Sequence, residues 1–107
     1  RYNTLLDSLP VKKPIFDENS AWHLYMIEVP EHDRKRVFNQ MRERGVGVNV
    51  HYIPIHLHPY YRNLGFKVGQ FPNAEQYYSH ALTLPLYPSL KQEEQHFVVS
   101  QLEEILL

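Results

Sequence analysis

The sequence predicts a mixed α/β domain of the α+β type, in which helices pack mainly on one face of a small three-stranded sheet. Two long segments, 31–44 and 91–106, carry apolar residues at helical spacing. Three short apolar or aromatic runs, at 21–29, 46–50 and 82–87, have the length of strands and adjoin proline or glycine. The total length of 107 residues is sufficient for one domain with a buried core.

The first helix predicted after the opening strand is the clearest element. It covers residues 31–44, with Val37, Phe38 and Met41 on its buried face. Gly45 is suited to end this helix, because glycine readily adopts the left-handed conformation of a helix C-terminus. The chain then returns as the predicted strand at 46–50.

The segment 51–69 is expected to be irregular, because it contains two prolines and two glycines, with a short helix near 60–64. Another helix is predicted from Phe71 to about His80. In the extended segment 82–87, Pro85 forces an edge position or a break, since proline cannot donate to a sheet ladder. The last predicted helix, at 91–106, has an apolar face of phenylalanine, valine, leucine and isoleucine.

Composition excludes several classes of function. The net charge is −1, whereas a protein that binds nucleic acid needs an excess of basic residues, so no nucleic-acid partner is expected. The sequence contains no cysteine, which excludes disulfides and thiolate metal sites and suits a cytoplasmic protein. No apolar run approaches the roughly 20 residues needed to cross a bilayer, so no membrane partner is expected.

The segment HYIPIHLHPYYR, residues 51–62, combines imidazole, phenol and guanidinium groups on a backbone restrained by two prolines. These side chains are suited to bind phosphate, sugar hydroxyl or carboxylate groups. Tyrosine also stacks on sugars and bases while offering a hydroxyl. The candidate ligand-binding residues are His51, Tyr52, His56, His58 and Tyr61.

Three interpretations of this segment remain open from the residues alone. In the first, the loop faces a polar ligand. In the second, it holds a metal: on an extended segment His56 and His58 would point to the same side, with His51 or a loop carboxylate as third ligand. In the third, the rings only pack beneath the loop. An alternative that stays open is an independent histidine-rich module that binds metal or sugar.

A family resemblance begins at residues 48–56, VNVHYIPIH. This motif resembles the C-terminal domain of the DegT/DnrJ/EryC1/StrS family of sugar aminotransferases. Four other segments resemble the same family in the same order: WHLY at 22–25, RGVGV at 44–48, FPNAE at 71–75 and LPLYP at 84–88. The resemblance therefore extends over essentially the whole chain.

This resemblance implies the C-terminal small domain of a fold-type I transferase that depends on pyridoxal phosphate. Residues 1–10 then correspond to the end of the helix that leads into the domain, and residues 11–107 to the domain itself. Within the family, the segment VNVHYIPIHLHPYYR is most similar to aminotransferases of the pseudaminic-acid pathway. Those enzymes aminate a UDP-linked 4-keto-6-deoxy-N-acetylhexosamine for bacterial surface sugars, with glutamate as the amino donor.

The family's Schiff-base lysine and the aspartate that pairs with the cofactor ring lie in a large N-terminal domain. No lysine of this chain stands in a setting similar to that motif; they are Lys12, Lys13, Lys35, Lys67 and Lys91. We therefore expect a piece of a longer enzyme that alone binds no cofactor and is inactive. The resemblance implies a homodimer when the protein is full length, with active sites near the subunit interface. It assigns substrate binding to His51, Tyr52 and His56, with His58 and Tyr61 following the same motif.

Overall fold

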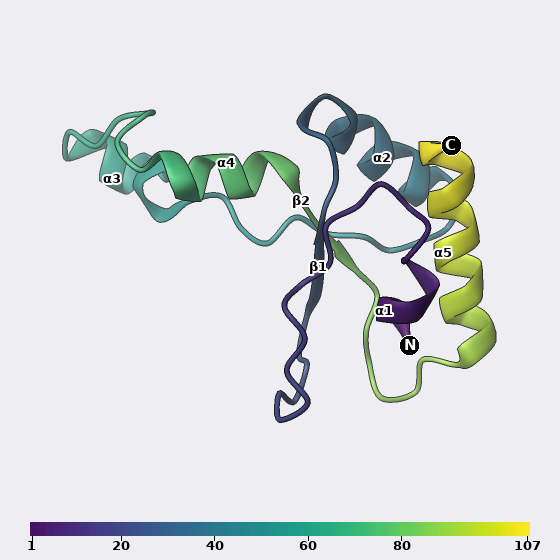
Figure 1. The fold of residues 1–107 in the computed structure, drawn as a ribbon. Helices are drawn as coiled ribbons and strands as arrows, with labels where there is room; N and C mark the ends of the chain where they lie inside the picture. Colours follow the sequence, from purple (N-terminus) through teal and green to yellow (C-terminus); the bar gives the residue numbers. More distant parts are fainter.

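The structure, a computed structural model, describes residues 1–107 except for the side chain of Glu31. Two antiparallel strands form its centre, β1 (Tyr25–Glu28) and β2 (Ala81–Leu84), as Figure 1 shows. In their register Ile27 lies opposite Leu82. Alternate side chains of β1 are buried, whereas all four residues of β2 are buried, because β2 is covered on both faces.

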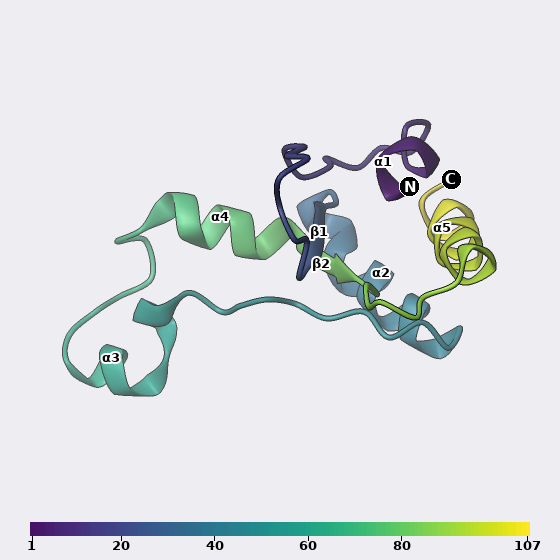
Figure 2. The same ribbon diagram turned by 90° about the horizontal axis from the view of Figure 1, so that it is seen from below.

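Three helices lie on one side of this sheet: α1 (Tyr2–Leu5), α2 (Glu31–Glu43) and α5 (Gln92–Leu106) (Figures 1 and 2). At the start of α5 the Glu94 carboxylate accepts a hydrogen bond of 2.9 Å from the backbone amide of Lys91. This bond satisfies an N–H group that has no partner within the helix. The prediction that helices pack mainly on one face of a small sheet is confirmed.

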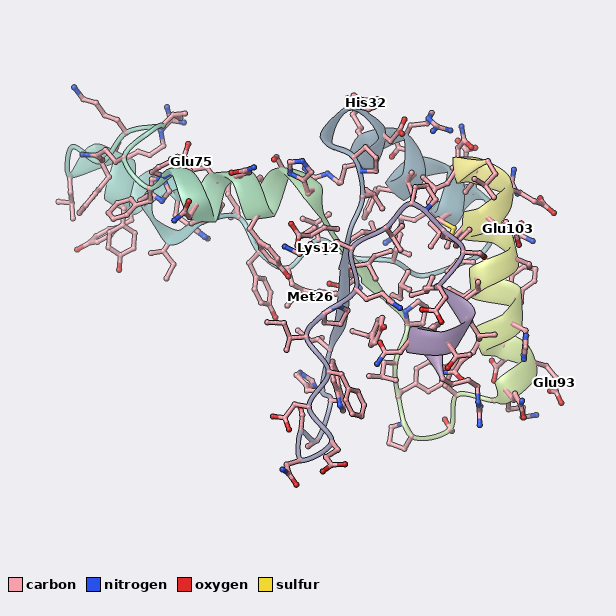
Figure 3. All side chains as sticks on the ribbon, in the orientation of Figure 1. Lys12, Met26, His32, Glu75, Glu93 and Glu103 are labelled. Atoms are coloured by element: carbon pink, nitrogen blue, oxygen red, sulfur yellow. The ribbon has the colours of Figure 1, made fainter. Side chains whose placement is uncertain are left out.

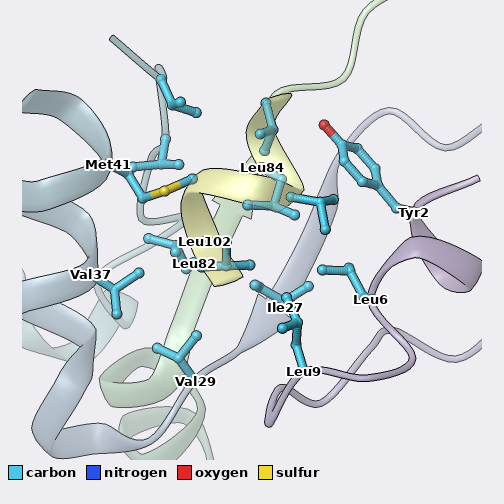
Figure 4. Packing of buried hydrophobic residues seen from close by; sticks show 14 of the residues in the cluster. Tyr2, Leu6, Leu9, Ile27, Val29, Val37, Met41, Leu82, Leu84 and Leu102 are labelled. Carbon is cyan, nitrogen blue, oxygen red and sulfur yellow. The ribbon is translucent and has the colours of Figure 1, made fainter. Parts of the chain in front are cut away.

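The hydrophobic core lies between the sheet and these three helices. Each element contributes residues that are essentially inaccessible to solvent, among them Ile27 of β1, Met41 of α2 and Leu102 of α5. Figure 4 shows this packing from close by. The N-terminal segment belongs to the same core, because Tyr2, Leu6 and Leu9 pack in it. The proposed domain boundary at residue 10 therefore stays a prediction.

Residues 50–80 form a projection, here called the arm, on the other side of the sheet (Figure 2). It contains a 3₁₀ turn, η1 (Ile55–Leu57), and two helices, α3 (Pro59–Asn63) and α4 (Pro72–His80). The helix α4 runs directly into β2. The arm explains why the radius of gyration is 15.2 Å, compared with about 13 Å for a compact chain of this length.

The third predicted strand is reduced to a single bridge, in which Asn49 exchanges backbone hydrogen bonds with Thr83. The register of this bridge explains why the ladder stops. The next hydrogen-bonded pair would join Gly47 to Pro85, and proline has no N–H to donate. The ordered sheet therefore has two strands.

Two other elements are shorter than predicted. The strand expected at 21–29 begins only at Tyr25, because Trp22 has a positive φ of 49° and its amide bonds to the Ser20 hydroxyl. His23 is consequently exposed and outside the strand. The first helix ends at Leu5, and turns rather than helix carry the chain on to Pro10. No helix in the described residues combines the length and apolar character needed to span a bilayer.

Candidate functional site

The three histidines of the segment HYIPIHLHPYYR occupy three different places. His51 lies where the arm leaves the core, His56 is buried inside the arm, and His58 is exposed on the arm surface. Each ring has its own hydrogen-bond partner. The arrangement therefore has two potential ligand-facing regions, one at the base of the arm and one within it.

His51 is held by the core strand β2. Its Nδ1 lies 2.8 Å from the hydroxyl oxygen of Thr83, a residue that is only 4% exposed. The Tyr52 ring meets the His51 ring edge-on, with ring centres 4.5 Å apart. Tyr52 itself is 69% exposed. The base of the arm thus offers a phenol to solvent beside an imidazole of fixed orientation.

His56 is the buried histidine of the arm, with an exposed fraction of 7%. Its Nε2 lies 3.0 Å from a carboxylate oxygen of Glu75, and its ring packs edge-on against Phe71 with centres 4.8 Å apart. The sequence separates His56 and Glu75 by 19 residues, so this contact closes the outer part of the arm into a loop. Figure 3 shows Glu75 on α4, within the arm.

Glu75 binds more than the imidazole. The backbone amide of Gly69 donates to its carboxylate at 2.9 Å, and the amide of Phe71 donates at 3.3 Å. The amide of Gly69 lowers the pKa of Glu75 most, and the hydrogen bond from His56 and the amide of Phe71 lower it further; partial burial opposes them. The side chain is therefore a carboxylate at neutral pH, and it joins three separate points of the arm.

An apolar groove of about 370 Å³ lies on the same part of the arm. Its walls include Ile55, Tyr61, Phe66 and Phe71, and His56 also lines it. The rings pack in series, with 6.1 Å between the centres of Tyr61 and Phe66 and 6.4 Å between those of Phe66 and Phe71. Such a surface is suited to the apolar face of a ring-shaped ligand.

The remaining predicted residues are placed as follows. Tyr61 shares this groove with His56, so the fold brings these two candidates together. His58 lies apart from it, with Nε2 3.3 Å from the carbonyl oxygen of Ile53. His51 and Tyr52 form the separate pair at the base of the arm.

The geometry gives no support to a metal site. Among the described residues, no group of three histidine or acidic side chains is arranged to hold a metal ion. The expectation that His56 and His58 lie on an extended segment is wrong, because residues 55–57 form a 3₁₀ turn. Pro54, which precedes the turn, and Pro59, which begins α3, fix the backbone in this non-extended path.

Sequence reasoning missed two residues of this region, Thr83 and Glu75. Thr83 reads as an ordinary strand residue, and nothing local shows that its hydroxyl reaches His51. Glu75 was part of the family-like motif FPNAE at 71–75. An acidic residue in the first turn of a helix is common, because it interacts favourably with the helix dipole, so it does not by itself indicate a functional site. Its pairing with His56 depends on the loop between them, so only the fold could reveal it.

These observations define the class as a small α+β domain that carries an arm with a histidine-tyrosine site. Residues 1–103 match the model of the DegT/DnrJ/EryC1/StrS aminotransferase family, and the chain belongs to that family. The spore coat polysaccharide biosynthesis protein SpsC of Bacillus subtilis is 36% identical over 115 residues, a match that covers 99% of this chain and 30% of SpsC.

Solved structures of aminotransferases have the same fold. A protein of Streptococcus pneumoniae described as a sugar aminotransferase superposes with a TM-score of 0.90 at 26% identity, over 98% of this chain and 28% of its own. That protein has been solved in forms with pyridoxal and pyridoxamine phosphate. The Helicobacter pylori aminotransferase PseC, of pseudaminic acid biosynthesis, superposes with a TM-score of 0.88 at 22% identity, covering 98% of this chain and 30% of PseC, which shows likeness of fold alone. The chain thus spans less than a third of these relatives.

The lysines nearest a cavity do not fit the cofactor of this family. Pyridoxal phosphate needs a lysine amine poised to form a Schiff base. Lys12 instead forms a surface ion pair with Glu28, 3.6 Å away, and its side chain is 78% exposed. Lys13 is bound by the Asp7 carboxylate and by the carbonyl oxygen of Asn3. Both amines are thus engaged by oxygen atoms of this chain.

Proposed function

We propose that this chain is the C-terminal small domain of a cytoplasmic aminotransferase that aminates a UDP-linked 4-keto-6-deoxy-N-acetylhexosamine with glutamate as donor. The pathway would supply a bacterial surface sugar such as pseudaminic acid. Membership of the family supports the reaction class. The spore coat polysaccharide role in the name of SpsC, and the resemblance of VNVHYIPIHLHPYYR to aminotransferases of the pseudaminic-acid pathway, favour the substrate class.

The observation that carries the proposal is the arm. It exposes apolar and aromatic side chains to a degree unusual for a domain that functions without a partner, which favours an interface. The largest of them are Tyr52, Ile53, Ile55, Tyr60, Tyr61, Leu64, Phe66, Val68, Phe71 and Tyr77. We propose that the rest of the enzyme, assembled as a homodimer, covers this surface and forms the substrate pocket against it.

Within that pocket, the residues of the arm would bind the nucleotide sugar. His51 and Tyr52 offer hydrogen bonds at the base of the arm. Tyr61 and His56 contribute polar groups to the wall of the apolar groove, and His58 lies on the adjacent surface. Groups of this kind suit a diphosphate or sugar hydroxyls on one side and a base or sugar face on the other.

The cofactor would be held by the part of the enzyme outside this chain. The ion pairs of Lys12 and Lys13 support that division, because their amines are engaged by carboxylates of this chain and not directed into a site for the cofactor. When bound there, pyridoxal phosphate supplies the electron sink that allows an amino group to be transferred. The role of this chain is to bind and orient the sugar and to exclude water.

The test uses the full-length enzyme with glutamate and a panel of nucleotide-linked keto-sugars. We expect mass spectrometry to detect a 4-amino product from the UDP-linked 4-keto-6-deoxy-N-acetylhexosamine. Product from another keto-sugar of the panel alone would keep the reaction class and overturn the substrate. An enzyme that binds no pyridoxal phosphate would overturn the proposal altogether.

A pair of variants tests the site. His51→Ala should raise the KM for the nucleotide sugar while the KM for glutamate is unchanged, because His51 contributes only to the sugar side. The matched control is His96→Ala, since His96 is exposed on α5, away from the arm. Equal sugar KM values in both variants would remove His51 from the site.

A further inference from the structure

We propose that Glu75 is a positioning residue that fixes the tautomer of His56, so that the imidazole presents a hydrogen-bond acceptor to the apolar groove. A hydroxyl or N–H group of the nucleotide sugar would then donate to His56 Nδ1. This inference rests on the proposed function, because it assumes that the groove contacts the nucleotide sugar. Glu75 acts only through His56 and touches no substrate itself.

The first step concerns the direction of the bond between Glu75 and His56. An ionised carboxylate can only accept hydrogen bonds. Glu75 is held in this form, since the backbone amides of Gly69 and Phe71 donate to it and lower its pKa. The ring nitrogen that faces it at 3.0 Å, Nε2, must therefore carry a proton.

The second step follows from the chemistry of imidazole. A neutral ring has one donor and one acceptor nitrogen, so a proton on Nε2 leaves Nδ1 as the acceptor. No buried side-chain nitrogen or oxygen in the described part of the chain lacks a partner. The hydrogen bond to Glu75 accounts for Nε2 only, so Nδ1 keeps some access to solvent, and the groove is the cavity that His56 lines.

The third step concerns rigidity. The ring of His56 is fixed by Glu75 and by its T-shaped contact with Phe71, whose ring lies at 60° to it. Glu75 is fixed in turn by the amides of Gly69 and Phe71. The acceptor is thus held in one orientation between apolar walls, where an unmatched polar group is costly. Such a site selects ligands that carry a donor at that point.

The tautomer can be measured without any substitution. We expect the full-length enzyme, labelled with ¹⁵N-histidine, to show the neutral ring of His56 with a protonated Nε2 and an unprotonated Nδ1. The His56→Ala spectrum assigns the signal by its absence. A protonated Nδ1 with a bare Nε2 would overturn the inference, whatever the kinetics of any variant.

The kinetic test is Glu75→Gln. A glutamine amide can either donate a hydrogen bond to Nε2 or accept one from it. The substitution therefore allows both tautomers of His56 with little change in side-chain shape. We expect the KM for the nucleotide sugar to rise about 2- to 10-fold, the range for one neutral hydrogen bond, with kcat and the KM for glutamate unchanged. The control is Glu103→Gln on α5, at the far end of the molecule in Figure 3, which should leave all three constants unchanged.

His56→Ala separates this inference from the proposed function. If it raises the sugar KM and Glu75→Gln in the same enzyme adds nothing, the two residues act as one unit and the inference is supported. If it raises the sugar KM while Glu75→Gln alone has no effect, the positioning role is overturned and the groove remains a substrate site. An unchanged sugar KM for His56→Ala overturns both the inference and the assignment of the groove.

Discussion

The core and the arm of this domain are stabilised by different means. In the core, side chains of every packed helix and both strands are buried, and most of them are aliphatic. In the arm, residues 50–80, the single buried side chain among those described is the polar His56. Burial of apolar area therefore stabilises the core, whereas a few directed hydrogen bonds shape the arm. The comparison teaches that one chain can contain a part packed around buried apolar side chains and a part that leaves most of its apolar side chains exposed.

This difference predicts unequal local stability. Regions with little buried apolar surface open more easily than the core of the same protein. The helix α3 has no buried residue, and its five residues are too few to be stable alone. We therefore expect the arm to open without the core. Binding sites are drawn from such regions, because their shape can still adjust to a partner.

The largest effect is expected from a cavity in the core. Leu102→Ala removes a side chain with no solvent exposure between α5 and the sheet. We expect the free energy of unfolding, measured with urea on the 107-residue chain, to fall by about 2–5 kcal/mol. The same substitution in the arm, Leu64→Ala, alters a side chain that is 63% exposed. It should change the free energy of unfolding by no more than about 0.5 kcal/mol.

If both leucine variants lost similar amounts of unfolding free energy, the contrast between core and arm would be wrong. The arm would then belong to the same cooperative unit through apolar packing. A loss below about 1 kcal/mol for Leu102→Ala would instead show that the core relaxes into the space.

A smaller and local effect is expected from acid. The pKa of Glu75 is lowered from its ordinary value of 4.5, chiefly by the amide of Gly69 and also by His56. Its stabilising contribution is therefore complete above about pH 4.5 and is lost as the pH falls through the lowered pKa. In ¹⁵N spectra recorded during acidification, the amide signals of Gly69 and Phe71 should move before those of β1 and β2.

The control for this titration is Glu75→Gln, which has no carboxylate to protonate. In that variant the two amide signals should no longer respond to acid in this range. Simultaneous loss of arm and core signals in the unmodified chain would contradict the independence of the arm.

The sequence predicted the helical part of the core well, for physical reasons. The period of apolar residues in α2 and α5 is long enough to be read locally, so Val37, Met41 and Leu102 are buried as their spacing indicates. The strand at 46–50 was different. Its apolar pattern is present, since Val46 and Val48 are buried, but in the register of the Asn49–Thr83 bridge Gly47 lies opposite Pro85, which has no N–H to donate. That register is set by the tertiary fold.

The candidate site divides in the same way. The unusual composition of 51–62 marked the right segment, because histidine, tyrosine and proline clusters are visible in the sequence. The direction of each ring was not visible. His51 is turned toward Thr83 and His56 toward Glu75, and both partners come from distant parts of the chain. Long-range pairing of this kind is set by the fold, whereas the identity of the segment is set by its residues.

The smallest effect is expected at the joint between the two regions, where the Thr83 hydroxyl meets His51. Thr83→Val keeps the shape of the strand residue and removes this hydrogen bond. His51 is only half-buried, so water can partly replace the hydroxyl, and we expect a loss of about 1 kcal/mol in unfolding free energy. The control Thr4→Val, at an exposed position of α1, should cost less than about 0.5 kcal/mol.

A double-mutant cycle decides whether this cost belongs to the hydrogen bond. In a His51→Ala background, Thr83→Val should cost nothing, because the hydroxyl has already lost its partner, and the valine side chain can be more stable there. The ¹⁵N signals of residues 51–56 should shift in the single variant while those of α5 stay in place. An undiminished cost in the His51→Ala background would show that Thr83 supports the core alone. The joint would then depend on other contacts, such as the backbone pairing of Asn49 with Thr83 and the bond from the Arg34 guanidinium to the carbonyl oxygen of Tyr78.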